Sequence, residues 1–299
     1  MTTLRVALPA EPVPAPTEPM KSLRTGLRVL LEFEQNQRDF SVTELAQRCE
    51  LTKSQVSKIL SALVGSGLLV QDPATRTFSV GQRCYVLGSR FTTYDSLCQA
   101  ATPSMRELLA RTGHSVRLSV PDGEQSLYLI GLEGPMFLHT GWRSGNSVPI
   151  GASSAGRVML AFMEPEVRKR LLSLPVPALT PHTVRDPARL KKLVEQAHRE
   201  GWSIQRNETS PGLGVVSVPL FRAAQQVVGS LGLTFPSHMV VESEESILVA
   251  ALHDAARAIS QRLGCGVYPF GIGAARVGVN RSGAHAGPEP VPVPARVKQ

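Results

Sequence analysis

The sequence lacks any uninterrupted apolar run that is long enough to cross a membrane as a helix. Such a helix takes about 20 predominantly apolar residues, and none occurs in these 299 residues, of which 42% are hydrophobic. Residues 1–15 also lack the apolar segment of a secretory signal peptide. These absences exclude an integral membrane protein, so we expect a cytoplasmic protein with no membrane partner.

Residue groups that commonly carry metal or catalytic chemistry are also missing. The four cysteines lie far apart and form no Cys-x-x-Cys pair, which argues against a disulfide framework or a zinc site. The seven histidines include no pair four residues apart, and there is no Gly-x-Ser-x-Gly, His-Glu-x-x-His or complete P-loop. We therefore expect no catalytic residues, no metal and no cofactor, although distant groups could still assemble an active site in space.

Proline crowds both ends of the chain. Five prolines lie in the first twenty residues, and four occupy alternate positions from Pro288 to Pro294. Each proline removes an amide donor and fixes φ, so neither a helix nor a central strand is expected there. We expect residues 1–20 and 266–299 to be disordered tails around a folded region of about two domains.

The first seventy residues after the N-terminal tail show helical patterns with clear start signals. Leucines at helical spacing predict a first helix that ends near Asn36. Ser41 and Glu44 form a capping-box pattern at the start of a second helix, and Thr52 with Gln55 can cap a third. A hairpin is expected next, with strands at residues 68–70 and 77–80 around a turn at 72–74. This order is typical of a winged helix-turn-helix.

Acidic side chains are absent from the face that the third helix is expected to expose. No Asp or Glu occurs between Lys53 and Val70, whereas residues 21–90 carry 10 Lys and Arg against 6 Asp and Glu. The expected contacts are Lys53, Ser54, Gln55, Ser57 and Lys58, with Arg76 at the tip of the hairpin. Such a face can approach phosphates and base edges in the major groove, so we predict double-stranded DNA as a partner. An ordinary solvated helix face is the alternative interpretation.

Several longer blocks of sequence resemble a known family. In the N-terminal part they are Ser22-Leu23-x-x-Gly26-Leu27-x-Val29-Leu30, Thr43-Glu44-Leu45-Ala46, Leu51-Thr52-Lys53-Ser54-Gln55-Val56-Ser57-Lys58-Ile59-Leu60, Gly67-Leu68-Leu69 and Phe78-Ser79-Val80-Gly81. In the C-terminal part they are Val148-Pro149-Ile150-Gly151-Ala152-Ser153-Ser154-Ala155-Gly156-Arg157-x-x-Leu160-Ala161, Thr180-x-His182-Thr183-Val184 and Glu208-x-x-x-Gly212 followed by Pro219. Together they resemble the IclR family of transcriptional regulators over about residues 21–265.

The resemblance implies an α+β fold made of two domains. A winged helix-turn-helix at residues 21–82 is joined by a linker helix, residues 83–102, to a GAF-like α/β effector-binding domain at residues 103–265 with a curved antiparallel sheet. The residue patterns agree with this fold. They predict strands at 116–120, 127–129, 215–220 and 227–235, with a turn at Pro121-Asp122-Gly123. They predict helices at 155–162, 165–172, 188–200 and 243–263. A further helix is expected from Pro103, at its first position, to Arg111, and it either continues from the linker helix or follows it.

In this family the effector lies between the sheet and a loop that leads into a helix. The resemblance therefore implies effector contacts by Ser154, Ala155, Gln205, Val215, Gly232 and Thr234. The helix start near Ala155 offers unpaired amides to a carboxylate. The chain departs from the family at Arg157, where Lys is usual, at Gln205, where some members have an acid, and at Gly232, where a hydroxyl occurs. Because the pocket thereby loses polarity and a repelling charge, we expect a larger, aromatic carboxylate and not a two-carbon acid.

Each pocket residue also has a structural interpretation. From the residues alone, Ser154 could be a helix cap, while Val215 and Thr234 could be ordinary core positions of strands.

The combined expectation is a homodimeric or homotetrameric transcriptional regulator. Two winged helices would bind half-sites of a palindromic operator, because one alone offers little surface for specificity. A small organic acid would change the DNA affinity by binding the C-terminal domain. The alternatives are a small-molecule enzyme or a protein-interaction adaptor, each with an accessory winged helix.

Overall fold

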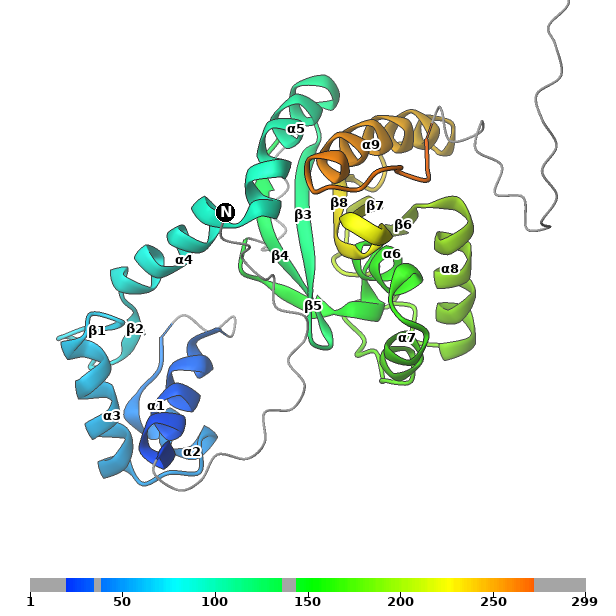
Figure 1. The fold of residues 1–299 in the computed structure, drawn as a ribbon. Helices are drawn as coiled ribbons and strands as arrows, with labels where there is room; N and C mark the ends of the chain where they lie inside the picture. Colours follow the sequence, from blue (N-terminus) through cyan, green and yellow to red (C-terminus); the bar gives the residue numbers. More distant parts are fainter. Residues whose placement is uncertain (1–19, 35–38, 136–143, 272–299) are drawn as a thin grey trace, which may run out of the picture.

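The structure is a computed structural model, and it describes residues 20–34, 39–135 and 144–271. Most of the two expected tails, and the expected helix end at Asn36, lie outside these residues. Figure 1 shows an N-terminal part and a larger C-terminal part, which the helix α4 connects. Among the described residues no helix has both the length and the apolar character needed to span a bilayer.

The N-terminal part has the predicted order of three helices and a hairpin. Its elements are α1 (Lys21–Leu31), α2 (Val42–Arg48), α3 (Lys53–Gly65), β1 (Leu69–Gln71) and β2 (Phe78–Val80). A short 3-10 turn, Glu32–Glu34, follows α1. Both predicted capping boxes are present, since Ser41 accepts from the amide of Glu44 and Thr52 accepts from that of Gln55, each at 3.2 Å. These caps fix where α2 and α3 begin, so the turn between the helices is tightly defined.

The three helices enclose a small apolar core of their own. The buried side chains that form it are Val29, Phe33, Phe40, Leu45, Ala46, Cys49, Val56, Leu60, Leu69 and Phe78. Phe40 also pairs with Phe78 through two backbone hydrogen bonds, so the segment before α2 adds a short third strand contact to the hairpin. The apolar side of α3 is therefore inside this core, and its polar side is left to the solvent.

The expected linker helix is two helices. α4 (Gln82–Tyr94) and α5 (Ser96–Thr112) meet at Asp95, whose backbone is extended at φ −69° and ψ 129°. The Oδ1 atom of Asp95 accepts from the amide of Cys98 at 2.9 Å and caps α5. The expectation of one linker helix over 83–102 is therefore wrong. The helix expected from Pro103 to Arg111 continues from the second part of the linker, so Pro103 is not its first residue. Pro103 lies inside α5, where the packing of Met105 and Leu108 into the core outweighs the one backbone bond that proline removes.

The C-terminal part is built on one curled antiparallel sheet of six strands in the order β5-β4-β3-β8-β7-β6 (Figure 1). The strands are β3 (Ser115–Asp122), β4 (Gln125–Leu132), β5 (Ser147–Pro149), β6 (Ser203–Arg206), β7 (Leu213–Phe221) and β8 (Val227–Pro236). The turn expected at Pro121-Asp122-Gly123 is instead at Gly123 and Glu124. Pro121 and Asp122 belong to β3, beyond the stretch that pairs with β8, and Gly123 turns with φ +56°.

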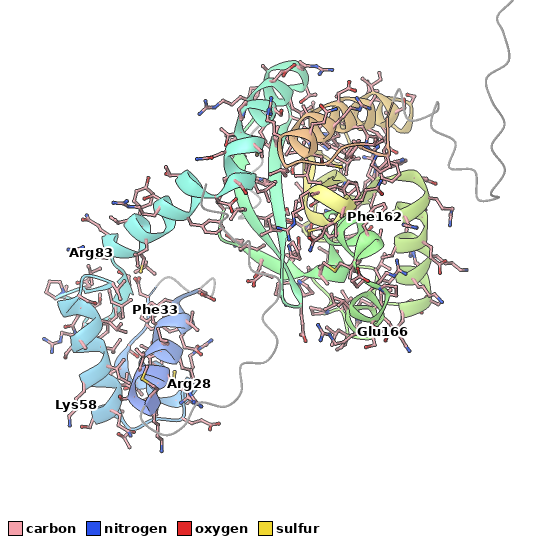
Figure 2. The ribbon with its side chains drawn as sticks, in the orientation of Figure 1. Arg28, Phe33, Lys58, Arg83, Phe162 and Glu166 are labelled. Carbon is pink, nitrogen blue, oxygen red and sulfur yellow. The ribbon has the colours of Figure 1, made fainter. Side chains whose placement is uncertain are left out.

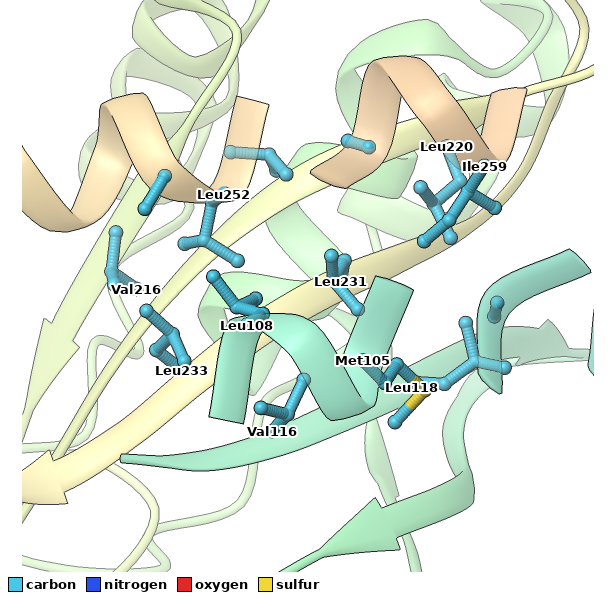
Figure 3. Packing of buried hydrophobic residues seen from close by; sticks show 14 of the residues in the cluster. Met105, Leu108, Val116, Leu118, Val216, Leu220, Leu231, Leu233, Leu252 and Ile259 are labelled. Carbon is cyan, nitrogen blue, oxygen red and sulfur yellow. The ribbon is translucent and has the colours of Figure 1, made fainter. Parts of the chain in front are cut away.

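Helices cover both faces of this sheet. One face packs against α5 and α9 (Glu242–Arg262), and Figure 3 shows the apolar side chains between them, among them Leu118, Leu231 and Leu252. The other face packs against α6 (Ser154–Phe162), with α7 (Pro165–Leu172) and α8 (Pro187–Glu200) outside it. The four helices predicted after residue 150 are thus all present, within about two residues of the expected bounds.

Ordered packing continues past the expected domain end at residue 265. Tyr268 is only 4% exposed, and its hydroxyl donates to the carbonyl of Pro219 in β7 at 3.1 Å. Phe270 packs against Gly201, where a Cβ atom would lie 2.3 Å from its ring. The boundary at 266 was therefore placed too early, because two aromatic side chains in a Gly-rich segment are enough to hold it on the domain.

Candidate functional site

The two faces of the six-stranded sheet carry different side chains. Along β3, Val116 and Leu118 point into the apolar core under α5 and α9. The residues that alternate with them, Ser115, Arg117 and Ser119, point to the other face, because side chains alternate along a strand. These three polar side chains are nevertheless buried, each with less than a tenth of its surface exposed. Burying polar groups is costly without a compensating partner, so polar partners for these side chains are expected on this face.

The strand register extends this polar face to the neighbouring strands. Arg117 pairs with Gly131 of β4 and Gly232 of β8, and Gly232 pairs with Ser217 of β7. Two residues after Arg117, Ser119 pairs with Tyr128 of β4 and Ser230 of β8. Two residues before it, Ser115 pairs with Thr234 of β8. Small or polar residues therefore occupy three consecutive rows across the centre of the sheet, beneath the start of α6.

A cavity of about 20 Å³ lies on this face. It is lined by Arg117, Ser119, Tyr128, Ala155, Leu213, Val215, Ser217, Gly232 and Thr234. Four of the six residues predicted from the family resemblance are thus brought together, namely Ala155, Val215, Gly232 and Thr234. This volume holds roughly one water molecule, so a larger ligand requires the surrounding side chains to move apart.

The other two predicted residues lie next to the cavity but have other partners. The hydroxyl groups of Ser154 and Ser217 are 3.0 Å apart and hydrogen-bonded. Gln205 is buried, its Nε2 donates to the hydroxyl of Thr209 at 2.8 Å, and its Oε1 accepts from the amide of Glu208 at 2.9 Å. Both Ser154 and Gln205 therefore support the wall of the cavity in this structure.

The loop before α6 positions the first turn of that helix against the cavity. Ser153 is the N-cap, and its hydroxyl accepts from the amide of Gly156 at 3.0 Å, so the cap is the residue before Ser154. A Cβ atom at Gly156 would lie 1.7 Å from the carbonyl oxygen of Ile150, which only glycine avoids. Ala155 then lies in the first turn, where helix amides have no intrahelical acceptor and attract anions.

Arg157, which differs from the usual Lys, is fully buried. Its Nε donates to the carbonyl of Gly151 at 3.3 Å, and its two terminal nitrogens donate to the carboxylate of Glu208. A planar guanidinium suits this two-pronged contact better than an ammonium does. These bonds connect α6, and the loop before it through Gly151, to the segment between β6 and β7.

Sequence reasoning missed five of the nine cavity residues, namely Arg117, Ser119, Tyr128, Leu213 and Ser217. Burial raises the pKa of Tyr128 to about 12, so the phenol stays protonated and can donate a hydrogen bond. For the residues of β3, the available signal was the alternation along the strand, which places Ser115, Arg117 and Ser119 on the side opposite Val116 and Leu118.

Two hydroxyls on the same face have no partner. Among the described residues, the Oγ atoms of Ser126 and Ser230 are buried and make no hydrogen bond. Ser230 is a cross-strand neighbour of Ser119, and Ser126 lies on β4 two residues before Tyr128. Buried polar atoms are rarely left unsatisfied, so these hydroxyls mark a face that is suited to a polar ligand or to water.

The predicted DNA-contact residues form a second candidate site, at the surface of the N-terminal part. Lys53, Ser54, Gln55, Ser57 and Lys58 on α3 are all exposed, as is Arg76 in the turn between β1 and β2. Figure 2 shows Lys58 on the outer side of α3, away from α1 and α2. This face is therefore not packed into the interior of the chain.

Gln55 has less freedom than its exposure suggests. Its Oε1 accepts from both the amide and the hydroxyl of Thr52, each at 3.0 Å, and so completes the helix cap. Only its amide NH₂ group remains to donate. A two-pronged contact with adenine uses both the oxygen and the nitrogen of a Gln side chain, so it would require the cap to break.

The turn that carries Arg76 is held by an acidic side chain. The Oδ1 atom of Asp72 accepts from the amides of Ala74 at 2.7 Å and Thr75 at 3.3 Å, and these bonds lower the pKa of Asp72. Arg76 itself has φ +60°, a conformation that non-glycine residues seldom adopt. Arg76 is thus exposed in this turn, and the neighbouring carboxylate of Asp72 is engaged by the backbone.

Two family models match this chain. One describes the IclR helix-turn-helix domain and matches residues 22–73, and the other describes the bacterial transcriptional regulator IclR C-terminal region and matches residues 91–261. The HTH-type transcriptional regulator KdgR of Dickeya chrysanthemi is 28% identical over 242 residues, which cover 81% of this chain and 79% of that protein. The HTH-type transcriptional repressor AllR of Escherichia coli is 24% identical over 262 residues, 87% of this chain and 97% of AllR.

Solved structures share the fold. An IclR transcriptional regulator from Alicyclobacillus acidocaldarius superposes with a TM-score of 0.74 at 23% identity, covering 81% of this chain and 98% of that one. An IclR homologue from Microbacterium hydrocarbonoxydans, complexed with 4-hydroxybenzoate, has a TM-score of 0.69 at 26% identity and covers 81% and 99%. The relatives are named as regulators and repressors, as we expected for a chain that is not an enzyme. The chain belongs to the IclR family of bacterial transcriptional regulators, with a helix-turn-helix domain and an effector-binding domain.

Proposed function

We propose that this regulator binds a palindromic operator as a homodimer, alone or paired into a tetramer, and that a small carboxylic acid controls the binding. The observation that supports DNA recognition most directly is the exposed face of α3, which carries two lysines and no acidic side chain. The proposed DNA contacts are Lys53, Ser54, Gln55, Ser57 and Lys58 in the major groove, with Arg76 on the adjacent backbone or minor groove. Because Oε1 of Gln55 is engaged in the cap of α3, the proposed role of Gln55 is to donate from its NH₂ group to guanine or thymine.

Exposed apolar side chains on two helices support a dimer. Leu23, Leu27 and Leu31 follow one another four residues apart along α1, and each exposes about half of its surface. On α4, Leu87 and Phe91 form a similar exposed pair. Monomeric proteins seldom leave such patches in water. A second copy of the chain fits them, because a two-fold contact near the winged helices would present two copies of α3 to one DNA molecule.

We propose that the effector binds on the polar face of the sheet, at the cavity beneath the start of α6. The proposed contacts are Ala155, Val215, Gly232 and Thr234, which line the cavity, with Ser154 and Gln205 supporting its wall. An aromatic carboxylate is supported by the relative that was solved with 4-hydroxybenzoate. A ligand of this size would separate α6 from the sheet, because the present cavity holds roughly one water molecule.

A mobility-shift assay with the DNA upstream of its own gene tests the proposal. We expect specific binding that falls steeply as salt increases, and that changes when 4-hydroxybenzoate is added. Lys53→Ala and Lys58→Ala should each weaken binding to all sequences and reduce the slope of log K against log salt by about 1. Lys192→Ala, which removes an exposed lysine from α8, is the matched control and should leave that slope unchanged.

Two results would contradict the DNA proposal. One is no retarded band at any salt concentration. The other is equal binding by the Lys58→Ala and Lys192→Ala proteins, which would support an adaptor that uses its winged helix for protein contacts.

A further inference from the structure

We propose that Arg117 binds the carboxylate of the effector, and that the carboxylate of Glu133 occupies this position until the effector replaces it. The inference rests on the proposed function, because it assigns a residue to one group of the same ligand. It adds a charged contact to a site whose other proposed contacts are uncharged, and it predicts which ligands are accepted.

Arg117 is the one charged residue among those that line the cavity within the described part of the chain. Its side chain is 10% exposed, and it lies at the centre of the polar face. Its two cross-strand neighbours are glycines, Gly131 and Gly232. A Cβ atom at Gly131 would lie 2.0 Å from Nη1 of Arg117, so the guanidinium lies directly over that glycine. The position is therefore shaped around the arginine.

Glu133 is already bound to Arg117 in the way that a ligand carboxylate would be. Nη1 of Arg117 donates to Oε1 of Glu133 at 2.7 Å, and Nη2 donates to Oε2 at 3.1 Å. Such two-pronged contacts are the usual geometry of arginine with any carboxylate. The protein thus shows that this guanidinium has room for a carboxylate.

The two partners of this ion pair differ in how easily they can leave it. The side chain of Glu133 is 39% exposed, against 10% for Arg117. Glu133 can therefore rotate into water, whereas Arg117 would remain buried with an uncompensated charge. Because an unpaired buried charge is strongly unfavourable, Arg117 will retain an anion, and only the identity of that anion can change.

The release of Glu133 would also alter contacts at the end of α5. The hydroxyl of Ser115 donates to Oε2 of Glu133 at 3.2 Å and accepts from the amide of Gly134 at 3.0 Å. Gly134 lies close to Gly113, the C-cap residue of α5. A Cβ atom on Gly134 would lie 2.3 Å from the carbonyl oxygen of Gly113. Binding of an acid at Arg117 is thereby connected to the helix that continues from α4.

A ligand must carry a negative charge to replace Glu133 at Arg117. A carboxylate can replace Glu133, because it restores the neutral pair with Arg117. An amide of the same shape cannot, since it lacks the negative charge and presents one acceptor in place of two. Isothermal titration of the full chain with 4-hydroxybenzoate and with 4-hydroxybenzamide compares the two. We expect the acid to bind at least about 30-fold more tightly, as is typical of charged pairs shielded from water.

Two variants test Arg117 within that experiment. Arg117→Met should weaken binding of the acid by at least about 30-fold and remove the preference for acid over amide. Gly131→Ala keeps every charge but places a methyl group where Nη1 of Arg117 lies. It should therefore weaken the binding of 4-hydroxybenzoate and leave the binding of 4-hydroxybenzamide unchanged. Undiminished preference for the acid in Arg117→Met would overturn the inference while leaving the proposed function in place.

A second measurement does not depend on the aromatic effector. Glu133→Ala leaves Arg117 without its counter-ion and opens space beside it, so the melting temperature should fall. Acetate at millimolar concentration should restore part of that loss, whereas acetamide should not. The double variant Arg117→Met/Glu133→Ala should show no effect of acetate.

The two measurements separate the failure of each claim. Rescue by acetate without any binding of 4-hydroxybenzoate would keep Arg117 as the anion-binding residue and remove the aromatic effector of the proposed function. Binding of 4-hydroxybenzoate without rescue, and with Arg117→Met unaffected, would remove Arg117 and keep the effector.

Discussion

The two faces of the six-stranded sheet are both covered by helices, yet they are built from different residues. Under α5 and α9 the strands contribute Val116, Leu118, Leu231 and Leu233, which are completely buried. Under α6 the same strands contribute Ser119, Ser230, Gly232 and Thr234, together with Arg117. The backbone that carries both sets is shared, and so is the degree of burial.

One face of the sheet therefore contributes mainly to stability, and the other has the residues of the proposed binding site. Apolar burial stabilises a fold by roughly 25 cal/mol for each Å² removed from water, and the α5 and α9 face provides it. The α6 face buries hydroxyls and a guanidinium, two of the hydroxyls without any partner among the described residues. Such a face stabilises the fold less than an apolar one of equal area. Its residues are those expected of a site that binds a polar ligand.

The largest effect is expected on the apolar face. Leu231→Ala removes a fully buried side chain from the core between β8 and the two covering helices. We expect the free energy of unfolding to fall by about 2–5 kcal/mol, through lost burial and a residual cavity. Urea denaturation followed by circular dichroism measures this. A loss below about 1 kcal/mol would show that the surrounding side chains close the cavity. The apolar face would then not be more important for stability than the polar face.

A smaller effect is expected from His253, the one histidine that is buried among the described residues. His253 of α9 lies next to Tyr268, with its Nδ1 3.1 Å from the tyrosine hydroxyl. Burial, assisted by the charge of Arg257, lowers the pKa of His253 to about 4. The unfolded chain binds this proton near pH 6.5, so the contribution is complete above that pH and is lost as the pH falls towards 4.

The size of this pH effect follows from the shift. A difference of two to three pKa units corresponds to about 3 kcal/mol. Urea titrations of wild type and His253→Asn at pH 7.5 and pH 4.5 measure it, since Asn keeps a donor near the position of Nδ1. The wild type should lose more stability than the variant between these pH values. Parallel pH profiles of the two proteins would show that His253 does not titrate in this way.

The smallest effect is expected on the polar face. Ser230→Ala removes a buried hydroxyl that has no hydrogen-bond partner among the described residues. Because no bond is lost and an unsatisfied polar atom is removed, the free energy of unfolding should change by less than about 1 kcal/mol, towards higher stability. The same urea titration compares it with its neighbour, Leu231→Ala. Destabilisation similar to that of the leucine variant would mean that the two faces are energetically alike.

Local signals in the sequence were sufficient to predict the helices of the N-terminal part. The pairs Ser41 with Glu44 and Thr52 with Gln55 are separated by three residues, and both act as capping boxes. The exposed side of α3 followed from the spacing of Val56 and the other apolar positions around the helix. Signals of this kind lie within one helical turn, so they can be recognised without knowledge of the tertiary structure.

Long-range register accounts for most of what the sequence could not predict. Arg117 became a cavity residue because β3 lies between β4 and β8, so that Gly131 and Gly232 flank it. Gly232 is more than a hundred positions away in the sequence, and no local pattern links it to Arg117. The same holds for Pro103, whose place inside α5 depends on packing against α9 and the sheet. The resemblance supplied four cavity residues without supplying the arginine between them.

The single extended residue between α4 and α5 has a mechanical consequence. Asp95 is the one position at which the two helices change direction, and α4 extends 13 residues from it towards the winged helix. At 1.5 Å per residue α4 is about 20 Å long, so a rotation of roughly 10° at Asp95 would displace its far end by about 3 Å. Successive bases along a DNA strand are separated by about 3.4 Å. In the proposed complex with DNA, such a tilt between α5 and α4 would therefore displace α3 by nearly one base step, enough to move it out of register with the proposed operator.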